Sequence, residues 1–445
     1  MAEAGARFEY ISGIWQSVAD RGRALVGIRR PAPVTVEALI DLARKLISGR
    51  GETSGVAAAA TLLASFAALD EADKRAFLAA ASDAFGPDLE ALQSAARAFL
   101  ETPDAARAAD LFERAEPQRQ ELVRRLNHAP GGAFALVKMR ETLLAAMKDG
   151  LALEPFDRDF RHLFASWFNR GFLVLRRIEW TTPANILEKI IRYEAVHEIS
   201  TWEELRRRLD PPDRRLYAFL HPALIDEPLI FVEVALTTAT PEAIAPLLAS
   251  GRGAIGAEAA TTAVFYSINN AQAGLAGVSF GNFLIKQVVE DLRRELPRLQ
   301  TFVTLSPVPG FARWLARERA DEASRFLTPE TRRVIEAIEA GETPDGADRA
   351  LCALAAGYFL HARDERGRVV DPVARFHLGN GARLERINPR GDRSAAGMRQ
   401  SLGLMVNYLY DLDTIEANHE AFANRGTVAA SGAVKKLAAA FAPKG

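Results

Sequence analysis

Residues 267–286 have the sequence Ser-Ile-Asn-Asn-Ala-Gln-Ala-Gly-Leu-Ala-Gly-Val-Ser-Phe-Gly-Asn-Phe-Leu-Ile-Lys, and residues 305–311 have the sequence Leu-Ser-Pro-Val-Pro-Gly-Phe. A β-branched and aromatic run just before the first string predicts a strand that ends near Ile268. Beyond Gly281 the helical spacing of the apolar residues predicts an amphipathic helix, which Pro297 closes. The predicted order is strand, glycine-rich turn, helix.

The glycine-rich turn, which contains Gly274, Gly277 and Gly281, has two interpretations. A turn that leads into a helix directs free N–H groups and the positive end of the helix dipole to one point, where a pyrophosphate would be stabilised. Glycines between a strand and a helix more often only make a tight turn. Spacing alone therefore leaves phosphate binding as the minority interpretation.

A second strand follows the helix, because apolar and polar residues alternate over 299–306. It is expected to end at an exposed Ser306, where Pro307 stops it. A serine before Pro307, Pro309 and Gly310 is usually part of a turn, so a catalytic role for Ser306 needs other support.

The second informative stretch is 373–410. Alternation around His377 predicts a short strand, the Asn-Gly pair at 380–381 predicts a hairpin turn, and a return strand is expected over 382–388. A lone histidine in a strand is more often structural than catalytic. A helix is expected to follow from Ser394, with an apolar face and with three polar or aromatic residues in its last turns, namely Asn407, Tyr408 and Tyr410.

Taken together, these strings resemble the malonyl-CoA decarboxylase family. Several separate motifs in the right order make the resemblance specific, and it covers essentially the whole chain past residue 150. The matching strings are Gly-Val-Ser-Phe-Gly-Asn-Phe-Leu-Ile-Lys (277–286), Leu-Ser-Pro-Val-Pro-Gly-Phe (305–311), His-Leu-Gly-Asn-Gly-Ala (377–382), Arg-Ile-Asn (386–388), Gly-Leu-Met-Val-Asn-Tyr (403–408), His221-Pro222, Glu227-Pro228 and Val234-Ala235-Leu236-Thr237.

The resemblance implies an α+β chain of two domains. Residues 1–168 would form an all-α helical bundle used for oligomerisation, and residues 169–445 a mixed α/β catalytic domain resembling the GNAT acyltransferase fold. In that fold the coenzyme A pyrophosphate lies on the turn between a central strand and the following helix. The corresponding residues here are Ala276, Gly277, Val278, Ser279, Phe280, Gly281 and Asn282.

The resemblance also implies a catalytic pair, Ser306 and His377. Loss of carbon dioxide from a malonyl thioester leaves an enolate, so the enzyme must stabilise charge on oxygen and deliver a proton to carbon. Ser306 would hydrogen-bond the carboxylate or the thioester oxygen, and His377, whose unperturbed pKa is near neutrality, would protonate the carbanion. No metal or cofactor is expected. Secondary candidates, each also explicable as turn, surface or helix-face residues, are Asn380, Arg386, Asn388, Asn407 and Tyr408.

Composition agrees with a folded protein large enough for two or three cores, with 445 residues, 49% of them hydrophobic and 25% charged. A net charge of −1 argues against a nucleic-acid binder. No apolar stretch of transmembrane length and no secretory signal is found, so a cytoplasmic protein without membrane contact is expected. Cys352, the single cysteine, is expected to be a buried thiol in a helix.

Before about residue 168 the apolar pattern is helical, and breaks at Pro103, Pro117 and Pro130 predict an antiparallel bundle. The alanines at 57–60 would serve either internal packing or a subunit interface. Packing is favoured by the residues alone, whereas the resemblance favours an interface, and so a homo-oligomer, either dimer or tetramer. The domain boundary is expected between Pro155 and Phe172.

Two other functions stay open. A GNAT-type CoA-dependent acetyltransferase would need an amine acceptor and would release free coenzyme A. A non-catalytic regulator would bind malonyl-CoA and leave it intact. Neither needs Ser306 and His377, so the motifs favour a carboxy-lyase of fatty acid metabolism that converts malonyl-CoA into acetyl-CoA and carbon dioxide, although one fold hosts many reactions.

Overall fold

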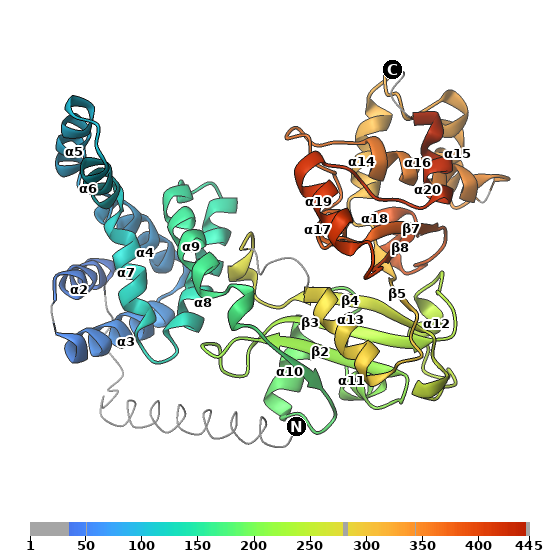
Figure 1. Ribbon diagram of the computed structural model, residues 1–445, viewed down its shortest axis with the longest axis horizontal. Coiled ribbons are helices and arrows are strands. Elements are labelled where there is room, and N and C mark those ends of the chain that lie inside the picture. Colours follow the sequence, from blue (N-terminus) through green and yellow to red (C-terminus); the bar gives the residue numbers. More distant parts are fainter. Residues whose placement is uncertain (1–34, 50, 279–283, 343, 442–445) are drawn as a thin grey trace. The chain divides into compact units, whose positions relative to one another are not determined.

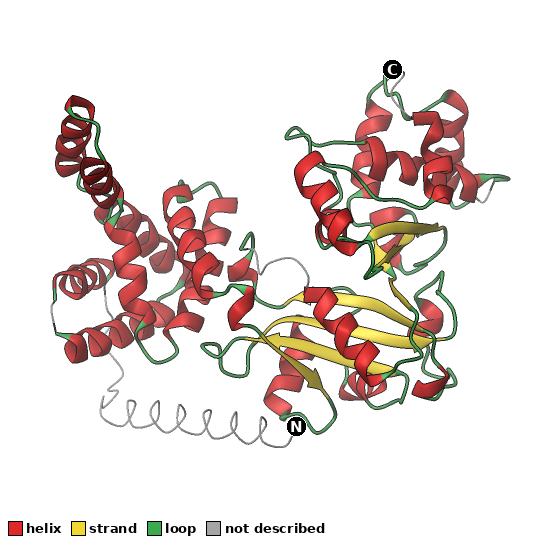
Figure 2. Ribbon diagram, in the orientation of Figure 1, coloured by secondary structure: helices red, strands yellow, loops and turns green. Residues whose placement is uncertain are grey.

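The computed structural model describes residues 35–49, 51–278, 284–342 and 344–441 (Figure 1). The described residues form two compact units. The first, the helical unit, is drawn from Met1–Val174, Leu220–Glu227 and Gln272–Phe280, and the second, the α/β unit, from Leu175–Phe219, Pro228–Ala271 and Gly281–Gly445. A helical region followed by a mixed α/β domain confirms the predicted fold class (Figure 2). Within the described residues, every helix is too short or too polar to span a membrane.

The helical unit consists mainly of helices, and several of them have starts that are capped by side chains. Asp70, Asp88 and Asp104 each accept a hydrogen bond from a backbone N–H in the first turn of the helix that follows. The predicted breaks at Pro103, Pro117 and Pro130 all fall between helices. The helices are α2 (Val36–Ser48), α3 (Glu52–Ala68), α4 (Glu71–Ala84), α5 (Leu89–Glu101), α6 (Ala105–Ala115), α7 (Gln118–Asn127), α8 (Gly132–Lys148) and α9 (Glu154–Trp167).

Buried ion pairs fix how these helices pack. Arg119 Nε lies 2.7 Å from Asp159 Oδ2, and Arg140 Nη2 lies 2.8 Å from Asp157 Oδ1. Arg140 also donates a hydrogen bond of 2.7 Å to the carbonyl of Gly274, in the 3₁₀ turn η3 (Ala273–Leu275). Removing one partner of such a pair would leave an uncompensated buried charge.

The α/β unit is built on one mixed sheet. Among the described residues its strand order is β1-β2-β3-β4-β5-β8-β6, with β7 paired to β8. Strands β3 and β4 are antiparallel, whereas β4 and β5 are parallel, from Thr262 opposite Thr301 to Phe265 opposite Thr304. The strands are β1 (Val174–Ile178), β2 (Arg214–Leu220), β3 (Pro228–Thr237), β4 (Thr262–Asn270), β5 (Thr301–Thr304), β6 (Ser306–Pro307), β7 (Arg383–Asn388) and β8 (Met405–Leu409).

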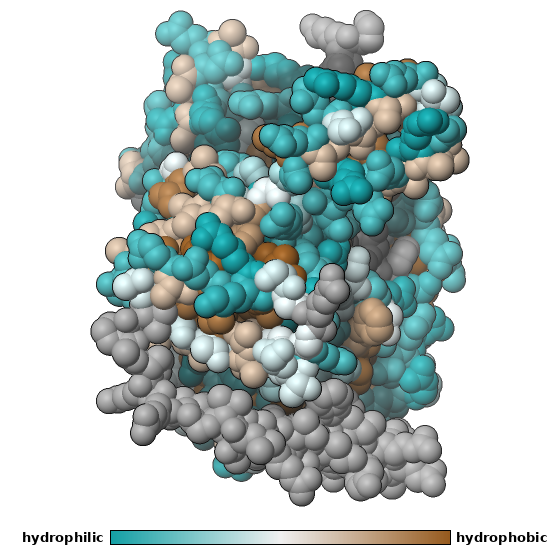
Figure 3. Space-filling view, turned by 90° about the vertical axis from the view of Figure 1, so that its left-hand side faces the viewer, coloured by the Kyte–Doolittle hydropathy of each residue, from teal (hydrophilic) through white to brown (hydrophobic). Residues whose placement is uncertain are grey.

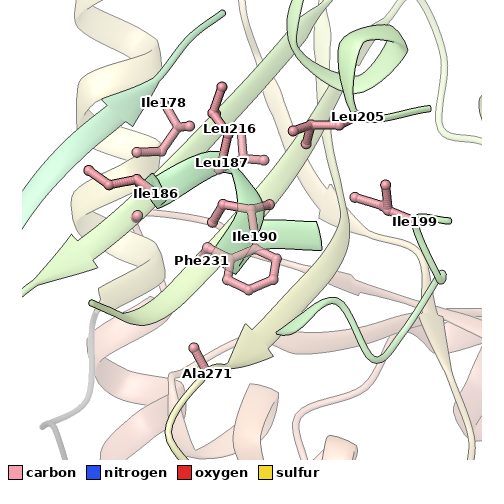
Figure 4. Close-up of a cluster of buried hydrophobic side chains, with 10 residues drawn as sticks. Ile178, Ile186, Leu187, Ile190, Ile199, Leu205, Leu216, Phe231 and Ala271 are labelled. Atoms are coloured by element: carbon pink, nitrogen blue, oxygen red, sulfur yellow. The ribbon is translucent and has the colours of Figure 1, made fainter. Parts of the chain in front are cut away.

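Helices pack on this sheet through apolar faces. Ile186, Leu187 and Ile190 of α10 belong to one buried cluster with Leu216 of β2 and Phe231 of β3 (Figure 4). The helices of the α/β unit are α10 (Ala184–Tyr193), α11 (Trp202–Leu209), α12 (Ala245–Leu248), α13 (Leu284–Glu295), α14 (Phe311–Ala320), α15 (Pro329–Glu339), α16 (Ala347–His361), α17 (Pro372–Gly379), α18 (Ala395–Ser401), α19 (Ile415–Arg425) and α20 (Gly432–Ala438).

Several local predictions are confirmed. The strand expected before the glycine-rich turn is β4, and the amphipathic helix after it is α13, whose predicted apolar residues are buried. The return strand after the Asn-Gly pair is β7. Cys352 lies in α16 and is 8% exposed.

The predicted strand around His377 is wrong, because this residue lies in helix α17. Asp371 caps the helix by accepting a hydrogen bond of 2.8 Å from the N–H of Ala374, and a proline follows at the first helical position. Asn380 and Gly381, which has a φ of +81°, close this helix instead of forming a hairpin.

The predicted helix from Ser394 to Tyr410 is also wrong in its second half. Helix α18 ends at Ser401, where Leu402 and Gly403 adopt φ values of +52° and +80°. Residues in this left-handed conformation terminate a helix. Asn407 and Tyr408 therefore lie in strand β8.

Ser306 was expected to be exposed at the end of a single strand, and this is wrong as well. It is 5% exposed, β5 already ends at Thr304, and Ser306 begins the short strand β6. Strand β6 pairs with β8 through Ser306 opposite Val406.

We predict that Gly274→Ala lowers the free energy of unfolding by about 1–3 kcal/mol, because overpacking forces backbone shifts. A Cβ added there would lie 2.0 Å from the carbonyl oxygen of Val137 in α8. Chemical denaturation measures the change. Gly55→Ala is the matched control, since a Cβ added at Gly55 has nothing within 4 Å. Equal stabilities of the two variants would contradict the close approach at Gly274.

Candidate active site

Two hydroxyl groups lie together at the end of β5 and the start of β6. Ser306 Oγ donates a hydrogen bond of 2.9 Å to Thr304 Oγ1. The same Thr304 oxygen accepts a hydrogen bond of 3.0 Å from the backbone N–H of Tyr408 in β8. Thr304 thereby fixes the Ser306 hydroxyl relative to β8.

His377 comes from α17 and is 2% exposed. Its Nε2 lies 3.1 Å from Ser306 Oγ, and its Nδ1 lies 2.8 Å from the hydroxyl of Tyr410. The imidazole ring stacks on the ring of Tyr408, with centroids 4.5 Å apart and an interplanar angle of 24°. Both ring nitrogens and one ring face of His377 are therefore held. The result is a buried hydrogen-bonded chain that we call the serine–histidine chain, formed by Tyr410, His377, Ser306 and Thr304.

Burial dominates the electrostatics of this chain. It lowers the pKa of His377 from 6.5 to about 3, and it raises the pKa of Tyr410 well above its ordinary value. The imidazole is therefore neutral near physiological pH in the free protein. The folded protein thus shifts the pKa of His377 away from the unperturbed value near neutrality.

Asp371 anchors the helix that carries His377. It is completely buried, caps α17, and accepts a hydrogen bond of 3.4 Å from the hydroxyl of Tyr358. Its Oδ2 also accepts from the N–H of Gly310, 3.4 Å away, just before α14. One carboxyl group thus ties the start of α17 to the segment that follows Ser306.

Asn407, Asn388 and Arg386 form a second cluster. Asn407 Oδ1 accepts hydrogen bonds of 2.8 Å from Asn388 Nδ2 and 3.1 Å from Arg386 Nε. Asn407 Nδ2 donates 2.7 Å to the backbone carbonyl of Thr304. Because side chains alternate along β8, this cluster lies on the opposite face from Tyr408, whose ring contacts His377. The structure therefore brings Ser306 and His377 together and places Asn407, Asn388 and Arg386 on the opposite face of the sheet.

The other predicted site residues differ in position. Asn380 closes α17, where its Nδ2 donates 2.8 Å to the carbonyl of Phe376. Tyr408 lies against His377, and its buried hydroxyl has no hydrogen-bond partner among the described residues. In the expected pyrophosphate turn, Ala276, Gly277 and Val278 are described, and Gly277 has a φ of +73°. The remaining residues of that turn lie outside the described part of the chain, namely Ser279, Phe280, Gly281 and Asn282.

Sequence reasoning missed two members of the serine–histidine chain, Thr304 and Tyr410. Thr304 precedes Ser306 by two residues in a strand pattern, and this spacing places both on one face. Tyr410 was assigned to a helix. Val406, Tyr408 and Tyr410, which alternate shortly after Gly403, are the signal for a strand that would have located it.

Comparison with known families places this chain, a helical region followed by an α/β unit, in the carboxy-lyase class of enzymes. Residues 85–168 match the malonyl-CoA decarboxylase N-terminal domain, and residues 171–444 match the malonyl-CoA decarboxylase C-terminal domain. The chain belongs to the malonyl-CoA decarboxylase family.

Solved and curated relatives agree with this assignment. The crystal structure of malonyl-CoA decarboxylase from Rhodopseudomonas palustris is 61% identical, covers 91% of this chain and 100% of its own, and superposes with a TM-score of 0.88. The corresponding values for the malonyl-CoA decarboxylase from Agrobacterium vitis are 57%, 90%, 99% and 0.85. The mitochondrial malonyl-CoA decarboxylase of Anser anser anser is 36% identical over 355 residues, which cover 73% of this chain and 70% of the relative.

We predict that the burial of His377 makes the fold sensitive to acid. Because its folded-state pKa of about 3 lies below the ordinary value of 6.5, neutral His377 contributes stability above pH 6.5, and this contribution is lost as the pH falls toward 3. In His377→Gln the loss of unfolding free energy between about pH 7 and about pH 4 should be smaller by up to about 3 kcal/mol.

Urea denaturation of both proteins across this pH range measures the difference. His128→Gln is the matched control, because His128 is exposed. Parallel pH profiles for the wild type and His377→Gln would show that His377 is not held neutral by the fold.

Proposed function

We propose that the protein decarboxylates malonyl-CoA to acetyl-CoA and carbon dioxide at the serine–histidine chain. The observation that carries the proposal is the 3.1 Å contact between Ser306 Oγ and His377 Nε2 inside a buried network. Membership of the malonyl-CoA decarboxylase family supports the substrate. Neither an acetyltransferase nor a ligand-binding regulator requires this pair.

The proposed reaction breaks the bond between the α-carbon and the carboxylate. The electron pair of that bond becomes an enolate whose charge is delocalised onto the thioester oxygen, so the reaction requires no metal and no organic cofactor. Ser306 would hydrogen-bond the carboxylate or the thioester oxygen. The buried hydroxyl of Tyr408 is a second donor for the same oxygen, because it adjoins His377 and has no hydrogen-bond partner among the described residues.

The proton that completes acetyl-CoA is assigned to His377. The imidazole is neutral in the free protein because it is buried, and a substrate carboxylate beside it would favour the charged form. His377 would therefore take up a proton as malonyl-CoA binds and deliver it to the α-carbon, directly or through Ser306. Tyr410, 2.8 Å from Nδ1, would hold the ring in the orientation that directs Nε2 at the reacting atoms.

The pyrophosphate of coenzyme A is assigned to the turn Ala276–Asn282, before α13. The positive φ of Gly277 supports this assignment, since a glycine in this conformation lets the backbone approach an anion closely. Asn380, Arg386, Asn388 and Asn407 are proposed as supporting residues, because each one hydrogen-bonds elements that carry the serine–histidine chain.

We predict that purified protein releases acetyl-CoA and carbon dioxide from malonyl-CoA in equal amounts. Ser306→Ala and His377→Ala should each lower kcat by about 10²–10⁴-fold, the range for removing a group that acts in proton transfer or charge stabilisation. Tyr410→Phe should lower kcat less, because it removes only the group that orients the ring.

Ser54→Ala and His128→Ala are the controls, since both residues are exposed in the helical unit. Wild-type rates in His377→Ala would remove this residue from the mechanism. Malonyl-CoA that binds but stays intact would indicate a regulator, and acetyl transfer to an amine with release of free coenzyme A would indicate an acetyltransferase. Either result contradicts the proposal.

We also propose that the protein is a homo-oligomer, dimer or tetramer, formed through the helical unit. Three large apolar side chains on α5 and α6 support this: Leu89, Leu100 and Phe112 are 71%, 76% and 81% exposed. Helix α6 has no buried residue. Hydrophobic patches are also visible among hydrophilic residues on the face drawn in Figure 3. Exposed apolar side chains that gather on one hairpin are typical of an interface.

We predict that the double variant Leu100→Asp, Phe112→Asp lowers the molar mass in solution, because two carboxylates would have to be desolvated at the interface. Size-exclusion chromatography with light scattering measures the mass, and circular dichroism shows that the helices persist. Ser54→Asp on α3 is the matched control. A wild type that is monomeric, or an unchanged mass in the double variant, would refute the interface.

We further propose that the protein acts in the cytoplasm and in fatty acid metabolism. Both solved relatives described above come from bacteria. Malonyl and acetyl thioesters of coenzyme A are the building units of fatty acids, so their interconversion would control that supply.

A further inference from the structure

The α/β unit contains a cavity with a charged lining. It has a volume of about 270 Å³ and is bounded by α11, by the segment 247–254 and by Tyr266 of β4. Four arginines line it, and the carboxylates in its lining belong to Glu198 and Glu204. The arginines are Arg207, Arg208, Arg214 and Arg252. None of these residues belongs to the serine–histidine chain.

Arg214 is the most deeply buried of the four arginines, with 3% of its surface exposed. Its Nη2 donates a hydrogen bond to the carbonyl of Leu247, and its guanidinium lies 5.6 Å from the centre of the Tyr266 ring. Its Nη1 is buried and has no hydrogen-bond partner among the described residues. Since a guanidinium keeps its proton in proteins, Arg214, which lines the cavity, holds a cationic donor that is unsatisfied among the described residues.

The two carboxylates that act on Arg214, those of Asp213 and Glu233, are bound to other arginines. Asp213 holds Arg252 with two contacts of 2.6 and 2.7 Å. Glu233 accepts a hydrogen bond of 2.9 Å from Arg208. Glu204, in the first turn of α11, accepts a hydrogen bond of 2.6 Å from the backbone N–H of Ser200, which lies just before the helix. Arg214 forms no ion pair within the described part of the chain, and an unpaired buried charge is costly.

We propose that this cavity binds a small oxyanion, a phosphate or a carboxylate, through the guanidinium of Arg214. Either group accepts charge-assisted hydrogen bonds from a guanidinium, and Arg207 and Arg252 place two further guanidinium groups in the same lining. The volume of about 270 Å³ suits a small anion and not a molecule of the size of coenzyme A.

A ligand in this cavity would be connected to the strands around Ser306 through packed side chains. Leu247, whose carbonyl is held by Arg214, belongs to one buried cluster with Leu305, Met405 and Tyr266. Leu305 precedes Ser306, and Met405 begins β8. An anion that neutralises Arg214 therefore stabilises the packing on which strands β5 and β8 rest.

The test is a titration of the full-length protein with sodium phosphate and, separately, sodium citrate, with sodium chloride at matched ionic strength as the reference. Isothermal titration calorimetry measures binding, and thermal unfolding measures the midpoint. Saturable binding of phosphate alone assigns a phosphate site, and binding of citrate alone assigns a carboxylate site. Saturable binding of either anion, or of both, supports an oxyanion site. If neither anion binds, the proposal is overturned.

Two variants locate the anion. Arg214→Met should weaken binding by about 10–100-fold, the loss expected for a charge-assisted hydrogen bond. Arg206→Met is its matched control, because Arg206 lies on α11, is exposed, and is absent from the cavity lining. Unchanged affinity in Arg214→Met would overturn the assignment.

Ala254→Glu keeps Arg214 and so separates binding from folding. Ala254 is exposed and lines the cavity, so the introduced carboxylate should occupy the anion position. Loss of binding at an undiminished unfolding midpoint supports the site. Affinity equal to that of the wild type would show that the anion binds elsewhere.

Discussion

The position of Ser306 depends on a change of strand partner. Strand β5 pairs in parallel with β4 only from Thr301 to Thr304, and the last contact is the bond of 2.9 Å from the N–H of Leu305 to the carbonyl of Phe265. Ser306 then pairs with Val406 of β8. Because β8 carries Tyr408 and leads directly to Tyr410, this change brings the serine to the two tyrosines that hold His377. The serine–histidine chain is thus a consequence of how the sheet is paired.

The two buried polar sites use charge in opposite ways. In the serine–histidine chain burial keeps His377 and Tyr410 neutral, because a region of low dielectric constant disfavours their charged forms. Arg214 is a buried permanent cation, and one of its donors has no hydrogen-bond partner among the described residues. A group that can change protonation suits proton transfer, whereas a group that cannot suits binding.

Elements that follow from a regular local pattern were predicted correctly. Elements whose type is decided by the residues at their ends were assigned wrongly. Strand β4 and helix α13 follow from periodicity, because each buries one regular face. The helix around His377 was missed because residues 375–378 also satisfy an alternating pattern, and only the Asp371 cap with Pro372 decides between the two. The strand β8 was missed because apolar spacing continues past Leu402 and Gly403, whose left-handed backbone ends the helix. The contact between Ser306 and His377 spans 71 residues, so no local pattern could place it. The family resemblance suggested the pair, and the sheet pairing explains how the two side chains meet.

Not every polar residue in the strings that carry the family resemblance lies in the serine–histidine chain. Asn407 belongs to one of them, yet its amide is engaged by Asn388 and Arg386 on one side and by the carbonyl of Thr304 on the other. Its hydrogen bond to Thr304 joins β8 to β5 at the residue two positions before Ser306. Since Thr304 Oγ1 also accepts the backbone N–H of Tyr408, the two strands are locked to each other on both faces of the sheet. A polar residue of a family motif can therefore serve to join two strands, while Tyr408 and the His377 ring that it contacts lie on the opposite face of β8.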